Sequence, residues 1–355
     1  MEGLQRIGPL TAIPRLLRQF GQYPAKILSR AGVNPSVLDN PENSIAFTDV
    51  GKLLEACVEA TKCHHFGLLV GQQAGTESLG LVGRLMRNAP TLGRAIHDVC
   101  LNQQRYVNGS VVYLSIQEER AFWGYGIHHP GMKAIEQAYD LVMAMGFNIM
   151  RELCGVLPEH VRLARRAPHD DRPYLKVFGH RPIFDSEQTA LEFSSSLLKQ
   201  RVKTANARVR EELEQAVAKY WTVTQPSTRD QVVRILRARS VCGSAVLTGV
   251  AEDMGIHPRT LNRRLRNEGT NFRDLRNLAR YEIARQLLTG THMKITDVAL
   301  ALGYAETSIF IRAFHAWSGK SPATWRKQPW DETEADVAGT PRHRTLLASA
   351  QNSPR

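Results

Sequence analysis

The chain has 355 residues, which is long enough for two domains that each bury a core. A hydrophobic content of 43% and a charged content of 23% are ordinary for a globular protein and argue against a disordered or fibrous chain. The net charge of +12 is unusual, and residues 228–330 carry most of it, with 17 Arg and Lys against 8 Asp and Glu.

A local excess that is mainly arginine favours contact with phosphates, because the guanidinium group offers a planar fork of donors. A solvated basic surface and attraction to anionic lipid are the alternatives. The cysteines are odd in number and form no CxxC pair, which indicates a reducing compartment; they are Cys57, Cys63, Cys100, Cys154 and Cys242. The N-terminus has no apolar signal core and no apolar run approaches membrane-spanning length, so we expect a cytoplasmic protein without membrane contact.

Residues 1–200 mix helical and strand periods, which predicts an α+β domain. Helices are expected on both sides of Pro24, at 53–60, from Thr91 onward and, as a long buried helix, over 133–154. Residues 111–116 and 121–127 are typical of a hairpin that turns at Glu118 and Glu119, and shorter strands are expected at 161–163 and 191–193. Four aromatic residues are expected in the core of this domain and not in a pocket: Trp123, Tyr125, Tyr139 and Phe147.

Residues 201–227 are expected to form a connector helix and a linker. Apolar residues three or four apart predict one stripe along the helix: Val202, Ala205, Val209, Leu213, Ala216 and Tyr220. The helix is either packed on its own domain or half of a dimer seam, and its short length favours the first. The linker is expected at 222–228, an all-α domain at 228–330, and a disordered tail at 331–355.

The most specific feature of the chain is a unit that occurs twice between residues 250 and 326. Each copy has an apolar helix, a glycine corner and a second apolar helix, which is the pattern of a helix-turn-helix. The corners are Gly255 and Gly303. A six- or seven-helix bundle with surface arginines is the alternative, but the repeat includes turn, core and outward positions together.

In the first copy, Val250, Ala251 and Met254 are expected to face inward, and Gly255 is expected to leave room for a tight approach of the two helices. Pro258 suits the first turn of the second helix. The outward residues predicted to bind DNA are Arg259, Asn262 and Arg263. Arginine binds guanine through two hydrogen bonds and asparagine binds adenine in the same way.

The second copy is less polar, so the first is expected to carry more of the base readout. Phe310 and Phe314 are expected inward. The outward residues predicted to bind DNA are Thr307, Ser308, Ile311 and Arg312. An amphipathic helix over 275–288, ended by Gly290, would hold the two units so that both enter one face of the duplex, roughly 34 Å apart.

The C-terminal hundred residues resemble the DNA-binding domain of AraC/XylS-family transcription regulators. The most specific stretch runs from Ile295 through Gly303-Tyr304, Phe310, Arg312, Trp317 and Gly319 to Trp325-Arg326. The resemblance implies two helix-turn-helix units that bind promoter DNA and activate or repress nearby promoters, with RNA polymerase as a partner. The family usually has a serine-like cap after the corner, where this chain has Ala305 and, in the first copy, His257. A missing cap costs on the order of 1 kcal/mol.

The N-terminal part is similar to the effector domain of the ornithine-utilisation and mycobacterial virulence regulators of this family, on its layout and on Arg181-Pro182-Ile183-Phe184-Asp185 and Leu191-Glu192-Phe193. The resemblance implies a bacterial protein acting on the nucleoid, a small-molecule effector and a homodimer. It does not imply arabinose as the ligand.

Two other classes of function are the alternatives to a ligand-responsive regulator. A metal- or redox-responsive regulator is suggested by Cys57, Cys63, His64-His65 and His128-His129, but the spacing suits no metal site, so buried thiols and ordinary histidines are favoured and neither metal nor cofactor is expected. The sequence has no GxSxG, phosphate loop, dinucleotide fingerprint or plausible triad, so we expect no enzymatic activity.

Overall fold

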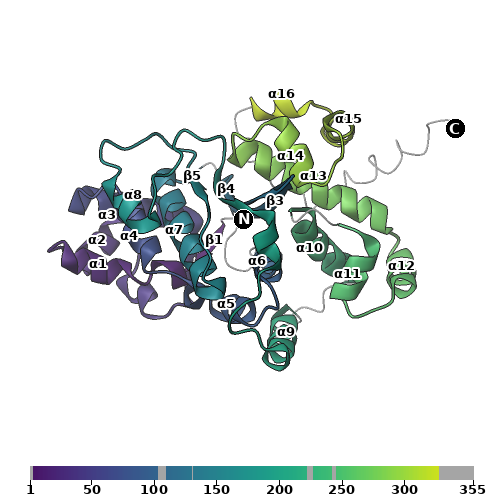
Figure 1. Ribbon diagram of the computed structural model, residues 1–355, viewed down its shortest axis with the longest axis horizontal. Coiled ribbons are helices and arrows are strands. Elements are labelled where there is room, and N and C mark those ends of the chain that lie inside the picture. The colour runs from purple at the N-terminus through teal and green to yellow at the C-terminus, as the bar shows by residue number, and fades with distance from the viewer. Residues whose placement is uncertain (1–2, 103–108, 130, 222–226, 242–244, 328–355) are drawn as a thin grey trace.

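The computed structural model describes residues 3–102, 109–129, 131–221, 227–241 and 245–327 (Figure 1). Its N-terminal part is α+β and its C-terminal part is helical, which confirms the predicted fold class. The expected tail, residues 222–226 of the expected linker, and Cys242 lie outside the described residues. Within the described ranges, no helix has the length and the apolar character that a membrane span requires.

The N-terminal domain contains a four-stranded antiparallel sheet in the order β3-β4-β6-β5. Its strands are β3 (Ser110–Gln117), β4 (Arg120–Ile127), β5 (His160–Arg162) and β6 (Thr189–Ser194). The hairpin turns at Glu118, as predicted, with a φ of 54°. A second, two-stranded sheet pairs β1 (Leu4–Arg6) with β2 (Ser44–Ala46).

Eight α-helices accompany the sheets in the described part of this domain. They are α1 (Ile13–Gln19), α2 (Pro24–Arg30), α3 (Phe47–Thr61), α4 (Phe66–Gln72), α5 (Gly80–Arg87), α6 (Leu92–Asn102), α7 (Ile135–Cys154) and α8 (Arg172–Phe178). Short 3-10 turns lie at η1 (Gly8–Leu10), η2 (Pro35–Asp39), η3 (Thr76–Leu79) and η5 (Ser195–Lys199). The predicted long helix is α7, and 14 of its 20 residues are buried because it packs between α4 and the sheet.

Glycines set the close approach of α4 to α7. A Cβ added at Gly67 would lie 2.0 Å from the carbonyl oxygen of Gln137, and one added at Gly71 would lie 2.1 Å from that of Leu141. Any side chain at either position would therefore push the two helices apart. Sequence periodicity gave no sign of this contact.

The connector helix is α9 (Ala207–Trp221), and it packs on α5 of its own domain. Leu213 and Val217 form a small buried cluster with Leu85. The predicted stripe was wrong in part, because the helix begins after Val202 and Ala205, and Ala216 is exposed. Leu213 is buried and Val209 packs against the same cluster, as predicted, whereas Val217 takes the inward position predicted for Ala216.

The C-terminal domain consists of helices, seven of them in its described residues. They are α10 (Thr228–Val241), α11 (Leu247–Asp253), α12 (Pro258–Asn267), α13 (Phe272–Gly290), α14 (Ile295–Ala301), α15 (Thr307–Ser318) and α16 (Pro322–Arg326). Figure 1 shows them in green to yellow beside the sheet, with α12 at the far right of the view and α15 at the top.

This domain packs against the free edge of the four-stranded sheet. The edge strand β3 contacts α10, α13 and α14, and β4 contacts α13 (Figure 1). Gly290 lies so close to β4 that an added Cβ would be 2.8 Å from the carbonyl oxygen of Ile127. Gly290 therefore marks a close approach of two backbones as well as the end of a helix.

Candidate nucleic-acid interface

The first helix-turn-helix unit consists of α11 and α12. Val250 and Ala251 are buried as predicted, and Met254 is half-buried. The prediction that Gly255 leaves room for a tight approach of the two helices was wrong, since an added Cβ there would meet nothing within 4 Å. Gly255 has a φ of +63°, so the corner requires glycine for its backbone conformation.

The second helix of this unit, α12, separates its inner and outer faces clearly. Leu261 and Leu265 are fully buried. Arg259 and Arg263 are exposed and Asn262 is half-buried. These three residues follow the spacing i, i+3, i+4, so they form one stripe along the helix. Arg266 is exposed and extends the stripe at i+7; the same spacing in the sequence could have identified it.

The second unit consists of α14 and α15, joined at Gly303 with a φ of +74°. Phe310 and Phe314 are fully buried, as predicted. Among the four residues predicted to bind DNA, Thr307 is half-buried and three are exposed: Ser308, Ile311 and Arg312. Ile309 is also exposed, so the outer face of α15 is much more apolar than that of α12.

The second helix of each unit, α12 or α15, has a different kind of N-cap. His257, treated above as a missing cap, is the N-cap of α12, because its Nδ1 accepts a hydrogen bond of 3.2 Å from the backbone N–H of Arg259. The N-cap of α15 is Glu306, which makes no capping hydrogen bond and instead accepts one from the Ser308 hydroxyl. The expected loss of a cap therefore holds for the second copy only.

The helix between the units, α13, is longer than predicted and spans 19 residues. Asn271 caps it by accepting a hydrogen bond from the backbone N–H of Asp274. Leu275, Ile283 and Leu287 are buried, while Leu278 is half-buried. Because α13 contacts α10, which packs on α11 and α12 of the first unit, and also contacts α14 and α15 of the second unit, it links the two units through packed side chains.

The arginines of this domain fall into two groups. Some are structural: Arg237 pairs with Glu282, Arg239 pairs with Asp253, and Arg280 stacks on Tyr304 at 4.6 Å from the ring centre. In contrast, no ion pair to a described residue is found for Arg259, Arg263 or Arg312. These exposed guanidinium groups can bind phosphates or base edges without first breaking a contact within the protein.

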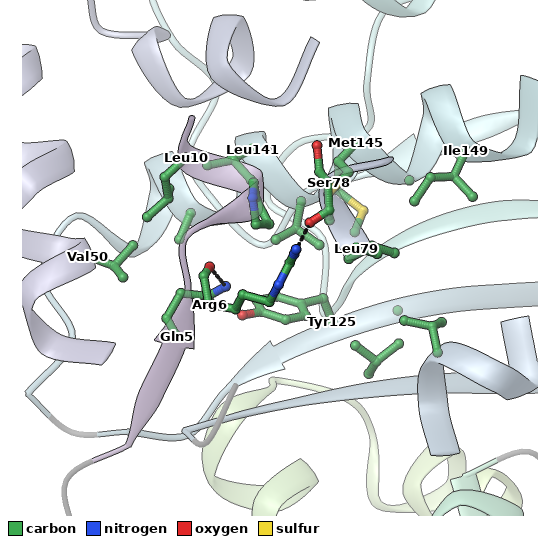
Figure 2. A pocket seen from close by; sticks show the side chains of 18 of the residues that line it. Gln5, Arg6, Leu10, Val50, Ser78, Leu79, Tyr125, Leu141, Met145 and Ile149 are labelled. Atoms are coloured by element: carbon green, nitrogen blue, oxygen red, sulfur yellow. Dashed lines mark hydrogen bonds between the residues drawn. The ribbon is translucent and has the colours of Figure 1, made fainter. Parts of the chain in front are cut away.

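A cavity of about 110 Å³ lies in the core of the N-terminal domain (Figure 2). Strands β1, β3 and β4 and helices α3, α6 and α7 all contribute to its wall. Trp123 and Tyr125 line it, so the prediction that they belong only to the core was wrong. Tyr139 and Phe147 are buried in the core, as predicted.

An ionic cluster joins this domain to the connector and to the first unit. Asp98 on α6 is almost fully buried and accepts hydrogen bonds of 2.8 and 3.0 Å from Arg210 on α9. Arg94, one turn earlier on α6, lies 3.3 Å from Asp98 and 3.7 Å from Asp253 of α11. These four residues (Arg94, Asp98, Arg210 and Asp253) therefore connect three parts of the chain that are far apart in sequence.

Two family models match the chain. The model of the arabinose-binding domain of AraC transcription regulators matches residues 21–202, which is more than half of the chain. The chain belongs to the AraC family of transcription regulators. A helix-turn-helix domain model matches residues 250–328 of this AraC-type regulator, so it is a DNA-binding regulator of transcription with an N-terminal effector domain, as predicted.

Characterised relatives match the AraC-type regulator over nearly its whole length. The regulator VirS of Mycobacterium tuberculosis is 24% identical over 322 residues, covering 88% of this chain and 93% of its own. The ornithine utilization regulator of Pseudomonas aeruginosa is 28% identical over 323 residues, covering 90% and 95%. The crystal structure of the regulator CdpR from Pseudomonas aeruginosa is 23% identical and covers 88% of this chain and 97% of that one, with a TM-score of 0.44.

The metal- or redox-responsive alternative finds no support. In the part of the chain that the structure describes, no three His, Cys, Asp or Glu side chains form a group able to hold a metal ion. Burial raises the pKa of the Cys57 thiol to about 12, so it stays protonated and unreactive near neutral pH. Burial, with His129 nearby, lowers the pKa of His128 to about 4, so this histidine is neutral in the folded protein.

Proposed function

We propose that this AraC-type regulator reads its DNA site with seven outward side chains and that an effector in the N-terminal cavity controls this binding. The DNA-binding residues proposed are Arg259, Asn262 and Arg263 of α12 and Thr307, Ser308, Ile311 and Arg312 of α15. The protein acts in the cytoplasm as a homodimer on paired promoter sites and contacts RNA polymerase there. Residues 1–200 sense the effector and dimerise, 201–227 connect, and 228–330 bind DNA.

The observation that carries the DNA-binding residues is the stripe of arginine and asparagine on α12. It is exposed, and neither Arg259 nor Arg263 is ion-paired within the described residues. Non-specific binding comes from phosphate contacts and weakens steeply with salt, whereas base contacts give preference for a site. The helix α13 holds the two units at a fixed separation, which supports entry into one face of the duplex about one turn apart.

Effector control is supported by α6 and β4, because both elements line the cavity and also contact the connector or the C-terminal domain. Val99 of α6 lines the cavity, and Asp98, the preceding residue, is bound to Arg210 of the connector. In β4, Tyr125 lines the cavity, and a Cβ added at the next residue, Gly126, would meet Thr291 at 2.7 Å. An effector that moves α6 or β4 would therefore act directly on the contacts that hold the DNA-binding domain.

The test uses a DNA site selected by the wild-type protein from a random-sequence library. Arg263→Ala is expected to lower affinity for that site by about 1 to 3 kcal/mol while affinity for random-sequence DNA falls much less. Arg264→Ala is the matched control, because Arg264 is also exposed but lies about 100° around the same helix. It should leave the ratio of specific to random affinity unchanged. An equal loss of both affinities in Arg263→Ala would refute the assignment.

A further inference from the structure

The wall of the N-terminal cavity is almost entirely apolar. It includes branched and sulfur-containing side chains from α3 and α7, among them Val50, Leu141, Met145 and Ile149 (Figure 2). Its volume of about 110 Å³ is below the range of about 300 to 1,000 Å³ that is usual for small-molecule sites, so it has room for a small ligand only. An apolar cavity of about 150 Å³ is sufficient to bind benzene, and burial of apolar surface drives such binding.

The polar groups at the cavity already bind one another. The Arg6 guanidinium donates to both carboxylate oxygens of Glu42 and to the backbone carbonyl of Ser78. The amide of Gln5 donates to the carbonyl of Arg6 at 2.9 Å. The Tyr125 hydroxyl is hydrogen-bonded to the side chain of Ser110. Each of these groups therefore already has a hydrogen-bond partner within the protein.

This arrangement disfavours sugars, amino acids and organic acids as ligands. A sugar brings several hydroxyl groups, and each one buried without a partner costs about 1 to 3 kcal/mol. A carboxylate would have to compete with Glu42 for Arg6, because Arg6 is the only cationic side chain among the described residues that line the cavity. The cavity has no acidic side chain in its lining to receive an ammonium group.

We propose that the cavity binds a small, neutral, largely apolar effector, such as a short hydrocarbon chain or a one- or two-ring aromatic molecule with at most one uncharged polar group. The proposal rests on the proposed function in one respect, that this cavity is the effector site. It concerns the chemical class of the ligand, and this class can be tested without DNA.

The first experiment measures binding of 2-naphthol, a small neutral fluorophore, to the full-length wild-type protein. Saturable binding is expected, and octanol should displace the probe at a concentration at least about tenfold lower than octanoate, because only octanoate has to bury a charge. L-Arabinose and L-ornithine should not displace it. Absence of saturable binding, displacement by octanoate as readily as by octanol, or displacement by the sugar or the amino acid would each overturn the proposal.

A pair of variants on α3 locates the probe. Val50 lines the cavity, while Val58, two turns later on the same helix, is half-buried outside its lining. Val50→Phe should weaken binding of the fluorophore at least about tenfold by filling the cavity, and Val58→Phe should leave it unchanged. Urea unfolding of both variants establishes that they are folded. If Val50→Phe does not fold, the competition series with the wild-type protein decides the question. Equal binding by two folded variants would contradict the assignment.

The same samples separate this proposal from the proposed function. Fluorescence anisotropy of a labelled selected DNA site is measured with and without octanol. If octanol occupies the cavity and DNA affinity does not change, the ligand class stands and effector control fails. If the fluorophore does not bind while specific DNA binding persists, the ligand class is wrong and the DNA-binding assignment remains.

Discussion

The two helix-turn-helix units share one sequence pattern and build different cores. The first unit has an aliphatic core of its own around Val250, Leu261 and Leu265, with Leu101 of the N-terminal domain at its margin. The core of the second unit is aromatic and continuous with the core of the N-terminal domain. In it, the ring of Phe314 lies 5.7 Å from those of Tyr281 and Trp325.

The units also differ in how they meet the N-terminal domain. The first is held by the ionic cluster, through Asp253, and by packing of α10 on α6. The second is held by α14 on β3 and by the close backbone approach of Gly290 to β4, where the Tyr139 hydroxyl donates to the Gly290 carbonyl at 3.4 Å. We infer that the first unit is specialised for reading DNA and the second for anchoring the domain.

Core truncations should separate the two units most strongly. Phe314→Ala is expected to lower the free energy of unfolding by about 3 to 5 kcal/mol, and Leu265→Ala by about 2 to 5 kcal/mol. Hydrogen exchange should then differ in extent. Phe314→Ala should raise exchange in α14 and in β3, since these elements share a core, whereas Leu265→Ala should raise it in α10, α11, α12 and the first half of α13 but not in β3. Faster exchange in β3 of Leu265→Ala would contradict the comparison.

The DNA contacts of the two units should be unequal. Arg263→Ala is expected to reduce the preference for the selected site by about 1 to 3 kcal/mol, and Arg312→Ala by less, because the face around Arg312 carries the apolar Ile309 and Ile311. The measurement is the ratio of affinities for the selected site and for random-sequence DNA at one fixed salt concentration. A greater loss in Arg312→Ala would mean that the second unit dominates the readout.

Acidification should loosen the contact of the first unit with the N-terminal domain. Burial, with Arg94 close by, lowers the pKa of His97 to about 4, and Asp253 and Arg239 of the C-terminal domain also act on it. In the unfolded chain this pKa is about 6.5, so between about pH 6.5 and pH 4 the unfolded state binds a proton that the folded state does not bind. The stability that depends on neutral His97 is therefore complete above pH 6.5 and is lost as the pH falls toward about 4.

His97→Gln removes this titration. Between about pH 7 and pH 5, wild-type protein should lose about 1 to 2 kcal/mol more stability to urea than the variant. Hydrogen exchange in α11 should rise more in the wild type than in the variant. His315→Gln, on the exposed surface of α15, is the control and should lose as much stability as the wild type. Identical pH profiles of stability for wild type and His97→Gln would show that His97 does not cause the loss of stability.

The smallest difference concerns the helix caps. His257→Ala should destabilise the first unit by about 0.5 to 1 kcal/mol, because α12 loses its side-chain cap. Glu306→Ser should stabilise the second unit by a similar amount, because α15 has no side-chain cap to lose. Thermal unfolding of both variants measures the two effects. A stability change of the same sign in both variants would show that the N-termini of α12 and α15 are capped equivalently.

The sequence by itself determined the features that depend on local periodicity. Patterns of residues a few positions apart predict the two helix-turn-helix units and the hairpin that turns at Glu118. The same patterns predict that Leu261 and Phe310 face inward and that Arg259 and Arg263 face outward. Spacing along one helix or strand decides which face a side chain occupies, so one stretch of chain is sufficient.

Only the tertiary structure decided the features that depend on distant segments. The cavity combines residues from Gln5 to Leu191, which is why Trp123 and Tyr125, buried in the core as predicted, also line it. The ionic cluster brings Asp98 to Arg210, and the contact of Gly67 with Gln137 needs two helices that are 70 positions apart. No local period encodes such pairs, because their free energy arises only when the whole chain has packed.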